Sequence, residues 1–301
     1  MSQGEQVVSV TGLERRFGSK LALDGLSLEV PRGQVFGIVG ENGAGKTTLI
    51  KHLLGLLRAQ QGQVRVFGQD PVSKPKDVLK RIGYLSEEPD MPGWMRVNEL
   101  MRYMAAFYPD WDQNYALELM DAFQLDPNKK IKQLSKGQRA RAGLVAAQAH
   151  RPDLLLLDEP SSGLDPIVRR DILGAVIRTV VDEGRTVIFS SHLLDEVQQV
   201  SDMVTMISSG KLVLSGAMDD VLGDHHKLIL NGPEGCQAPD LPNQLRSDGW
   251  GRNWSAVCTG NAADAEAAAK AAGWTLVRRE GISLDEIFVA RSGHSANAEV
   301  A

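Results

Sequence analysis

A glycine-rich stretch near the start of the chain, GENGAGKTT, has the residue types of a phosphate-binding loop. It fits the pattern G-x-x-x-x-G-K-[ST] with Gly40, Gly45, Lys46 and Thr47. The glycines of such a loop let backbone N–H groups close on phosphate oxygens. We expect Lys46 to reach the β- and γ-phosphates, the Thr47 hydroxyl to bind Mg²⁺ and the Thr48 hydroxyl to reach the α-phosphate.

The segments on either side of this loop support the same interpretation. Residues 35–39 form an apolar run typical of a buried strand, and residues 47–57 continue at helical spacing. A strand before and a helix after are the context of a phosphate-binding loop, whereas a purely structural glycine turn does not need them. We therefore expect a nucleotide here, with Asn42 and Gly43 among the residues that contact it.

Two carboxylates follow a second apolar run. Residues 154–157 are all leucine, and Asp158 and Glu159 come directly after them. Ligands of open parallel sheets bind at the carboxyl ends of the strands, so both side chains are expected beside the phosphate loop. Asp158 suits Mg²⁺ binding through water, and Glu159 suits a general base that polarises the attacking water. A solvated carboxylate pair at a strand end is the alternative.

Strand and helix patterns alternate along most of the chain. The strand-like segments DLLLLDEP, TVIFSSH and MVTMISSG are separated by helical stretches such as residues 167–184. Before LSKGQ, one helical face carries Val97, Leu100, Met101 and Met104. The pattern predicts an α/β fold, with a P-loop NTPase core, a mostly parallel sheet and a helical subdomain inserted at about residues 88–150.

The composition changes toward the C-terminus. Residues 231–251 are rich in Gly, Pro, Asp and Asn without a clear period, and we interpret them as linker or loop. They are followed by an alanine-rich helix stopped by Gly273, a strand over residues 274–280, and a helix opened by the capping-box pair Ser283 and Glu286. We predict a nucleotide-binding domain over residues 1–224, a small α+β domain over 225–291 and a disordered tail over 292–301.

The overall composition limits the classes of function. The 301 residues carry a net charge of -5, with a pI of about 5.7, so no global basic field attracts nucleic acid. No apolar run approaches the ~20 residues of a membrane-spanning helix, and the N-terminus lacks the pattern of a signal peptide. Cys236 and Cys258 lack metal-binding spacing and are expected to be reduced thiols. We expect a cytoplasmic protein.

A second polar turn, LSKGQ, opens another helix. Ser135 and Gln138 stand at the S-x-x-Q spacing of a capping box, which is the structural interpretation of this turn. A helix N-terminus with free N–H groups is also an anion-binding site, so the turn equally suits contact with a phosphate. The residues alone leave both interpretations open.

Five motifs in this order make the chain resemble the ATP-binding cassette (ABC) ATPases. They are GENGAGKTT, LSKGQ, LLLLDEP, SSGLD and SSH, and the resemblance covers residues from about 7 to 222. With its C-terminal SLDEIF, the chain is similar to bacterial exporter ATPases of the antibiotic- or lipid-exporting type. The resemblance implies an ATPase that uses ATP and Mg²⁺. It also implies a dimer, in which the LSKGQ turn of one copy binds the γ-phosphate held by the loop of the other copy.

The resemblance assigns further roles at matching positions. Phe17 in RRFG would stack on adenine, with a strand residue packed in the core as the alternative. His192 in SSH would contact the γ-phosphate and sense its loss. The family signature falls on Ser135, Gly137 and Gln138, and Asp165 in SSGLD would line the dimer interface.

Two positions depart from the family pattern. Lys136 replaces the commoner glycine of the signature and adds a positive charge near bound phosphates. Glu87 stands where the family has glutamine, because YLSE aligned on Y-x-x-Q selects it over Glu88. A carboxylate is a good Mg²⁺ ligand, so we expect Glu87 to face the metal and the attacking water.

These observations predict the ATP-hydrolysing subunit of an ABC membrane exporter, peripheral on the cytoplasmic face. A separate permease would supply the membrane-spanning segments, and a second cassette, identical or paralogous, would complete the dimer. Trp94 and Met95 are candidates for docking that permease. A soluble ABC ATPase acting on ribosomes or DNA is the alternative, whereas a GTPase or small-molecule kinase has no use for LSKGQ and SSH.

Overall fold

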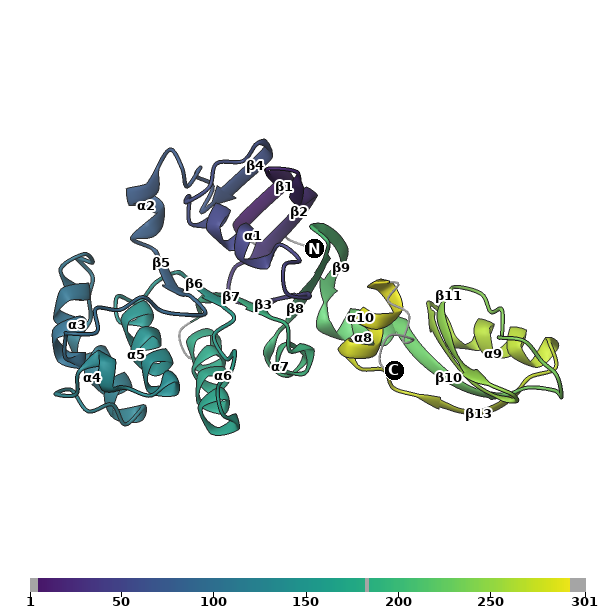
Figure 1. Ribbon diagram of the computed structural model, residues 1–301. Helices are drawn as coiled ribbons and strands as arrows, with labels where there is room; N and C mark the ends of the chain where they lie inside the picture. The colour runs from purple at the N-terminus through teal and green to yellow at the C-terminus, as the bar shows by residue number, and fades with distance from the viewer. Residues whose placement is uncertain (1–4, 182–183, 293–301) are drawn as a thin grey trace. The chain divides into compact units, whose positions relative to one another are not determined.

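The protein is described by a computed structural model over residues 5–181 and 184–292. These residues form two compact units that divide between Leu214 and Ser215 (Figure 1). The first unit is built on two sheets and the second on one. The domain boundary expected after residue 224 stays a prediction. The tail predicted over residues 292–301 lies outside the described residues, apart from Ser292 at the end of the last helix.

A three-stranded antiparallel sheet opens the first unit. Its strands, in the order β2-β1-β4, are β2 (Lys20–Pro31), β1 (Gln6–Phe17) and β4 (Gln61–Val66). The apolar–polar alternation of β2 buries Leu26, Leu28 and Val30 on one face of this sheet. Phe17 pairs directly with Lys20 across a tight turn, so both residues lie at the end of the β1–β2 hairpin.

A six-stranded, mostly parallel sheet follows and confirms the predicted fold class. In spatial order its strands are β5 (Ile82–Leu85), β6 (Leu154–Asp158), β7 (Thr186–Ser191), β3 (Val35–Val39), β8 (Met203–Ser208) and β9 (Lys211–Ala217). Every residue of β3, β6 and β7 is buried, as expected for parallel strands covered on both faces. The parallel pairing of β6 and β3 with β7 brings the residues that follow all three strands to one edge.

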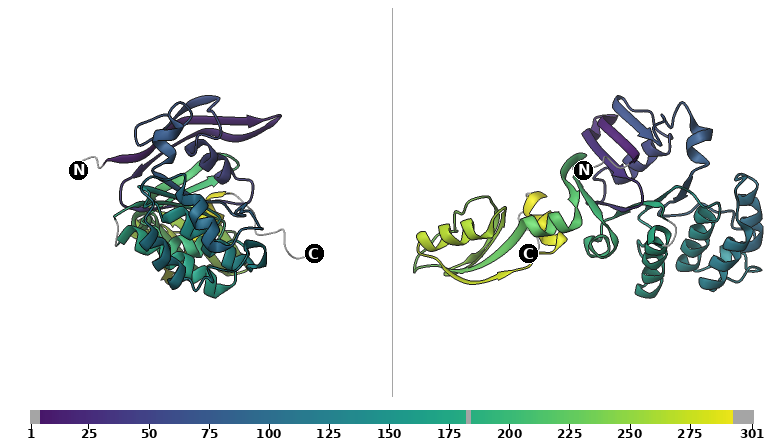
Figure 2. Two further views of the ribbon diagram at one scale, coloured as in Figure 1. Left: turned by 90° about the vertical axis from the view of Figure 1, so that its left-hand side faces the viewer. Right: turned by 180° about the vertical axis from the view of Figure 1, so that it is seen from behind.

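Helices pack around these sheets. They are α1 (Lys46–Leu53), α2 (Pro75–Leu79), α3 (Val97–Ala105), α4 (Gln113–Ala122), the 3-10 helix η1 (Ile131–Gln133), α5 (Lys136–Gln148), α6 (Pro166–Val181) and α7 (Leu194–Val200). α1 shares one apolar core with both sheets, in which Leu49 packs in a cluster with Val30 and Ile188. α3, α4 and α5 group beside β5 and β6, as seen from opposite sides in Figure 1 and in the right-hand view of Figure 2. This group falls within the predicted helical insert.

His150 connects this helical group to the sheet. Its ring stacks on Tyr108 with 3.7 Å between centroids, and its Nε2–H donates to the carbonyl oxygen of Ile82 in β5 at 3.1 Å. The side chain is only 3% exposed. Burial lowers the pKa of His150 to about 4, so the ring is neutral in the folded protein at neutral pH.

The second unit is a four-stranded antiparallel sheet with three helices. Its elements are α8 (Met218–Asp224), β10 (His225–Asn231), β11 (Gln244–Trp250), β12 (Asn253–Thr259), α9 (Ala262–Ala271), β13 (Thr275–Glu280) and α10 (Leu284–Ser292), with strand order β11-β12-β10-β13. Leu228, Cys258 and Trp274 pack against Ala269 of α9 in the core. The capping box of Ser283 and Glu286 is confirmed.

The prediction of a linker or loop over residues 231–251 is wrong in part, because strand β11 lies within this range. β11 is an edge strand with no buried residue, so its sequence shows no apolar alternation. Pairing with β12 gives the segment its structure instead. Over the residues that the structure describes, we find no helix with the length and apolar character needed to cross a membrane.

We expect the folded state to lose stability as the pH falls from 6.5 toward about 4, partly because of His150. In this window the unfolded chain takes up a proton at the ordinary histidine pKa while the buried ring does not, so protons favour unfolding. His150→Gln keeps an N–H donor for Ile82 but cannot titrate. The drop in Tm between about pH 7.5 and about pH 5 should therefore be smaller in this variant. An equal drop in variant and wild type would contradict the assignment.

Candidate nucleotide-binding and catalytic site

Glycines shape the loop between β3 and α1. Gly43 and Gly45 have φ angles of 82° and 117°, a region that favours glycine. A Cβ on Gly45 would also lie 2.7 Å from the carbonyl oxygen of Ala22, so a side chain does not fit there. α1 begins at Lys46, and no side chain within the described ranges caps its N-terminus. The first N–H groups of α1 therefore remain available to an anion.

A cavity of about 430 Å³ lies over this loop. The residues that line it are Phe17, Lys20, Ala22, Glu41, Asn42, Gly43, Gly45, Lys46, Thr47, Thr48, Glu87 and Glu159. All predicted loop residues except Gly40 are in this set, and the Gly40 carbonyl accepts a hydrogen bond from Lys46 Nζ. Residues distant in sequence thus meet around one concave site of ligand-binding size.

Phe17 lies at this cavity rather than in the core, because 46% of its surface is exposed. The guanidinium of Arg15 lies over its ring, with 4.6 Å from Cζ to the ring centroid. A cation over one face of the ring makes a cation–π contact that orients it.

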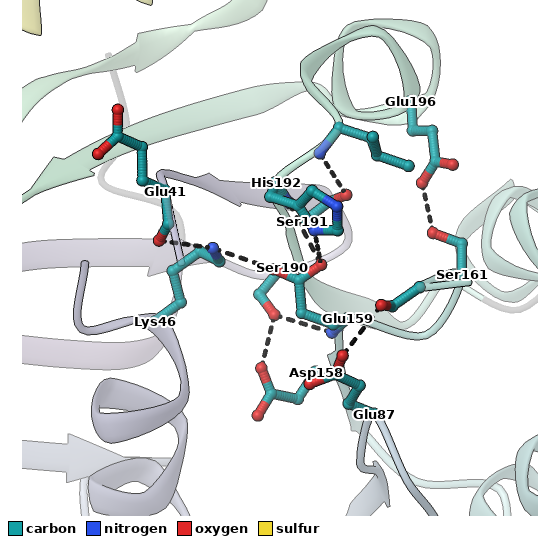
Figure 3. A network of polar contacts seen from close by, with 12 residues as sticks. Glu41, Lys46, Glu87, Asp158, Glu159, Ser161, Ser190, Ser191, His192 and Glu196 are labelled. Carbon is teal, nitrogen blue, oxygen red and sulfur yellow. Dashed lines mark hydrogen bonds and ion pairs between the residues drawn. The ribbon is translucent and has the colours of Figure 1, made fainter. Parts of the chain in front are cut away.

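Glu159 lies between a lysine and a histidine at the carboxyl end of β6 (Figure 3). Lys46 Nζ is 3.0 Å from Glu159 Oε1, and both side chains are buried. The other oxygen, Oε2, accepts the backbone N–H of His192 at 3.2 Å and is 2.7 Å from His192 Nδ1. A carboxylate held from both sides has a fixed direction, as a base that orients a water molecule requires.

Asp158 and Thr47 form an oxygen-rich pair beside this carboxylate. Thr47 Oγ1 donates to Asp158 Oδ1 at 3.2 Å, and Ser190 Oγ donates to the same oxygen at 2.8 Å. Burial is the main cause that raises the pKa of Asp158, and the two hydroxyls oppose it. A divalent cation here would stabilise the buried carboxylate, and carboxylate and hydroxyl oxygens are donors that Mg²⁺ accepts. The residues present therefore fit such an ion.

Glu87 lines the nucleotide cavity and also a second one. Its Oε1 accepts a hydrogen bond from Ser162 Oγ at 2.9 Å. The second cavity, of about 330 Å³, is also lined by Lys136 and Arg139 of α5. Both departures from the family pattern, Glu87 and Lys136, thus lie around one cavity and bring opposite charges to it.

The LSKGQ turn is a capping box at the start of α5. Ser135 Oγ accepts the N–H of Gln138, and Gln138 Oε1 accepts the N–H of Ser135, both at 3.2 Å. A Cβ on Gly137 would lie 2.8 Å from Cγ2 of Val168, so glycine allows α5 to pack on α6. Asp165 Oδ1 caps α6 by accepting the N–H of Val168 at 3.1 Å.

These signature residues do not join the nucleotide cavity of their own chain. Ser135, Gly137, Gln138 and Asp165 are all absent from its lining. Asp158 and His192 are also absent from the lining, but they are joined to it by hydrogen bonds to Thr47 and Glu159. The two residues predicted to dock the permease differ in exposure. Trp94 is 70% exposed, whereas Met95 is 8% exposed. The expectation for Met95 is therefore wrong, since its side chain is buried.

This fold and site define a P-loop nucleoside triphosphatase, and comparisons with known proteins narrow the class. A family model described as "ABC transporter" matches residues 23–162. The chain is 33% identical over 223 residues to the bacitracin transport ATP-binding protein BcrA of Bacillus licheniformis, covering 73% of this chain and 71% of that protein. It is 35% identical over 249 residues to the daunorubicin resistance ATP-binding protein DrrA3 of Streptomyces coeruleorubidus, covering 79% and 78%. The match spans 65% to 78% of the length of the first relatives.

Solved structures agree. A structure described as the ATP-binding subunit of an ABC transporter has a TM-score of 0.66 and 25% identity, covering 71% of this chain and 91% of that chain. The chain therefore belongs to the ATP-binding subunits of the ABC transporter family, whose cassettes bind and hydrolyse ATP. The predicted ATPase activity is thereby confirmed.

Sequence reasoning misses Lys20. It lies opposite Phe17 at the end of the β1–β2 hairpin and lines the same cavity. A Cβ built on Gly43 would lie 3.6 Å from Lys20 Nζ, so the ammonium approaches the phosphate loop. The available signal is the F-x-x-K spacing, which a tight hairpin turns into a facing pair. The hairpin thus presents an aromatic ring and a positive charge to one cavity.

We expect Lys20→Gln to weaken ATP binding about two- to fivefold, the effect of losing an exposed ionic contact. The weakening should shrink at high salt, because exposed charges are screened. Titration with a fluorescent ATP analogue at two salt concentrations measures both effects. Lys51→Gln is the matched control, since Lys51 is exposed on α1 and does not line the cavity. Equal affinities in the two variants would remove Lys20 from the site.

Proposed function

We propose that the chain powers a membrane exporter as one of two ATP-hydrolysing cassettes. The observation that carries the proposal is the separation of two half-sites within one chain. Lys46 and Glu159 line the nucleotide cavity, and His192 is bonded to Glu159, whereas the Ser135 turn lies outside the lining of that cavity. Relatives named for bacitracin transport and daunorubicin resistance support antibiotics as the class of cargo.

The nucleotide would be bound by the hairpin and the phosphate loop together. Phe17 would stack on adenine, while Lys46 and the N–H groups at the start of α1 hold the phosphates. The loop positions that contact phosphate are Gly40, Asn42, Gly43, Gly45, Thr47 and Thr48. Mg²⁺ would be held by Thr47 and Asp158, with Glu87 facing it, and would offset the negative charge of the phosphates.

Hydrolysis would depend on Glu159 and its two neighbours. Glu159 accepts a proton from the attacking water, and its direction is fixed because Oε2 is held by His192. Lys46 stabilises negative charge that develops on the γ-phosphate. His192, bonded to the base through Nδ1, keeps its other ring nitrogen for the γ-phosphate. Loss of that phosphate therefore changes the contacts of the group that orients the base.

The second half-site would serve a second cassette. The N-terminus of α5 carries Ser135, Gly137 and Gln138, and Asp165 lies at the start of α6. Facing another copy, the α5 N-terminus would bind the γ-phosphate held by that copy's loop. Two nucleotides would then close the dimer, and hydrolysis would release it.

Complementation tests this arrangement. Chains with Lys46→Ala and with Ser135→Arg should each be nearly inactive alone. In a mixed dimer the intact loop of the Ser135 variant faces the intact signature of the Lys46 variant, so one complete site is rebuilt. ATPase activity should therefore rise on mixing above the sum of the separate samples. Mixed dimers confirmed by cross-linking that regain no turnover would count against the role in trans.

The membrane-bound part of the transporter would be a separate permease. Trp94, which is exposed, precedes α3 and is the remaining docking candidate for a permease helix. The chain would then be a peripheral subunit on the cytoplasmic face of the membrane. A soluble ATPase on ribosomes or DNA is the competing function, but the relatives named above are transport and resistance proteins.

We expect the affinity-tagged chain to co-purify from detergent-solubilised membranes with a multi-span protein. Inside-out vesicles that contain both should accumulate daunorubicin only with ATP, because export from a cell is uptake into such vesicles. Vesicles that contain the Lys46→Ala variant are the control, because this variant should not hydrolyse ATP. Co-purification with ribosomes instead would contradict the transporter function, and ATP-independent accumulation would contradict export.

A further inference from the structure

The backbone at Glu159 has an uncommon conformation. Its φ is 50°, in the left-handed region, although it is not glycine. Such a conformation costs free energy and persists only where neighbouring contacts impose it. The residues that hold the chain immediately before and after Glu159 therefore decide where its carboxylate points.

Contacts with β7 hold the chain on the N-terminal side of this position. The N–H of Glu159 donates to Ser190 Oγ at 3.0 Å and to the Ser190 carbonyl oxygen at 3.2 Å. Ser190 Oγ in turn donates to Asp158. Hydrogen bonds to β7 thus hold the backbone where it enters the left-handed conformation at Glu159.

Glu196 holds the chain on the C-terminal side. Ser161, two residues after Glu159, donates from Oγ to Glu196 Oε2 at 2.5 Å (Figure 3). Both partners are almost fully buried, with 1% of Ser161 and 2% of Glu196 exposed. A hydrogen bond to a buried carboxylate is among the stronger polar contacts in proteins, because water does not compete for it.

Glu196 also connects this turn to two other parts of the site. It lies in the first turn of α7, four residues after His192. Its Oε1 is 2.8 Å from Nε of Arg169 in α6, and the N–H of Arg169 donates to the carbonyl oxygen of Asp165 at 3.0 Å. One buried carboxylate therefore joins the Glu159 turn, the His192 segment and the start of α6.

We propose that Glu196 is a positioning residue for the general base. By holding Ser161 it keeps Glu159 in the left-handed conformation, so that the carboxylate stays between Lys46 and His192. Through Arg169 it fixes the same turn relative to Asp165, which faces the second cassette. The inference rests on the proposed role of Glu159 and adds the group that maintains its direction.

Two variants test it at the two ends of one contact. Ser161→Ala removes a single hydroxyl, and Glu196→Gln removes the charge, so that an amide cannot both accept from Ser161 and pair with Arg169. We expect kcat for ATP hydrolysis to fall about tenfold in each, with KM for ATP within about twofold of wild type. Because both variants weaken the contact between Ser161 and Glu196, the double variant should lose less than the product of the single losses. Asp195→Asn, the same chemical change at the exposed neighbouring residue, should keep wild-type kcat.

Thermal unfolding and the binding of a fluorescent ATP analogue are measured for each variant alongside the kinetics. They distinguish a loss of catalysis from a loss of folded protein or of ATP binding. A merely structural role would lower Tm in Ser161→Ala while kcat per folded molecule stayed at the wild-type value, and that result would overturn the proposal. Glu159→Gln is assayed in parallel. If it is inactive while Ser161→Ala and Glu196→Gln turn over normally, only the positioning role fails. If Glu159→Gln itself keeps full turnover, the assignment of the base fails and the positioning role fails with it.

Discussion

The buried ion pair between Lys46 and Glu159 is the contact on which the site depends. Burying either charge alone would be costly, so each must meet an opposite charge in good geometry. The lysine follows β3 and the glutamate follows β6, with β7 between the two strands. Only parallel strands with matched carboxyl ends bring these two chain segments, and His192 after β7, to within contact distance. The sheet is therefore the part of the fold that makes the chemistry possible.

A nucleotide at the loop would change this balance of charges. Lys46 also donates to the carbonyl oxygens of Gly40 and Glu41, so its ammonium already points along the loop where phosphate oxygens would be bound. Phosphate would compete with Glu159 for the lysine and leave the carboxylate free to accept a proton from water. Contacts between the site residues would thus keep the proposed base in place before the substrate binds, and substrate binding would activate it.

Much of the site could be predicted because its motifs encode local geometry. A glycine loop between strand and helix, carboxylates after a leucine run and a capping-box serine each need only neighbouring residues to take shape, and the structure has all three. Helix ends were harder to predict. The predicted helix over residues 47–57 ends as α1 at Leu53, because Gly55 adopts a φ of 70° that stops it. The spacing of apolar residues alone does not predict that turn.

The sequence by itself determined the fold class, the phosphate loop, the acidic pair at the end of β6 and the family. Tertiary structure alone decided which side chains share a cavity, because that depends on contacts between residues far apart in the chain. It placed Lys20 at the nucleotide cavity, buried Met95, and made an edge strand of residues 244–250 through pairing with β12. It also joined Ser161 to Glu196 across 35 positions, a pairing that no local pattern encodes.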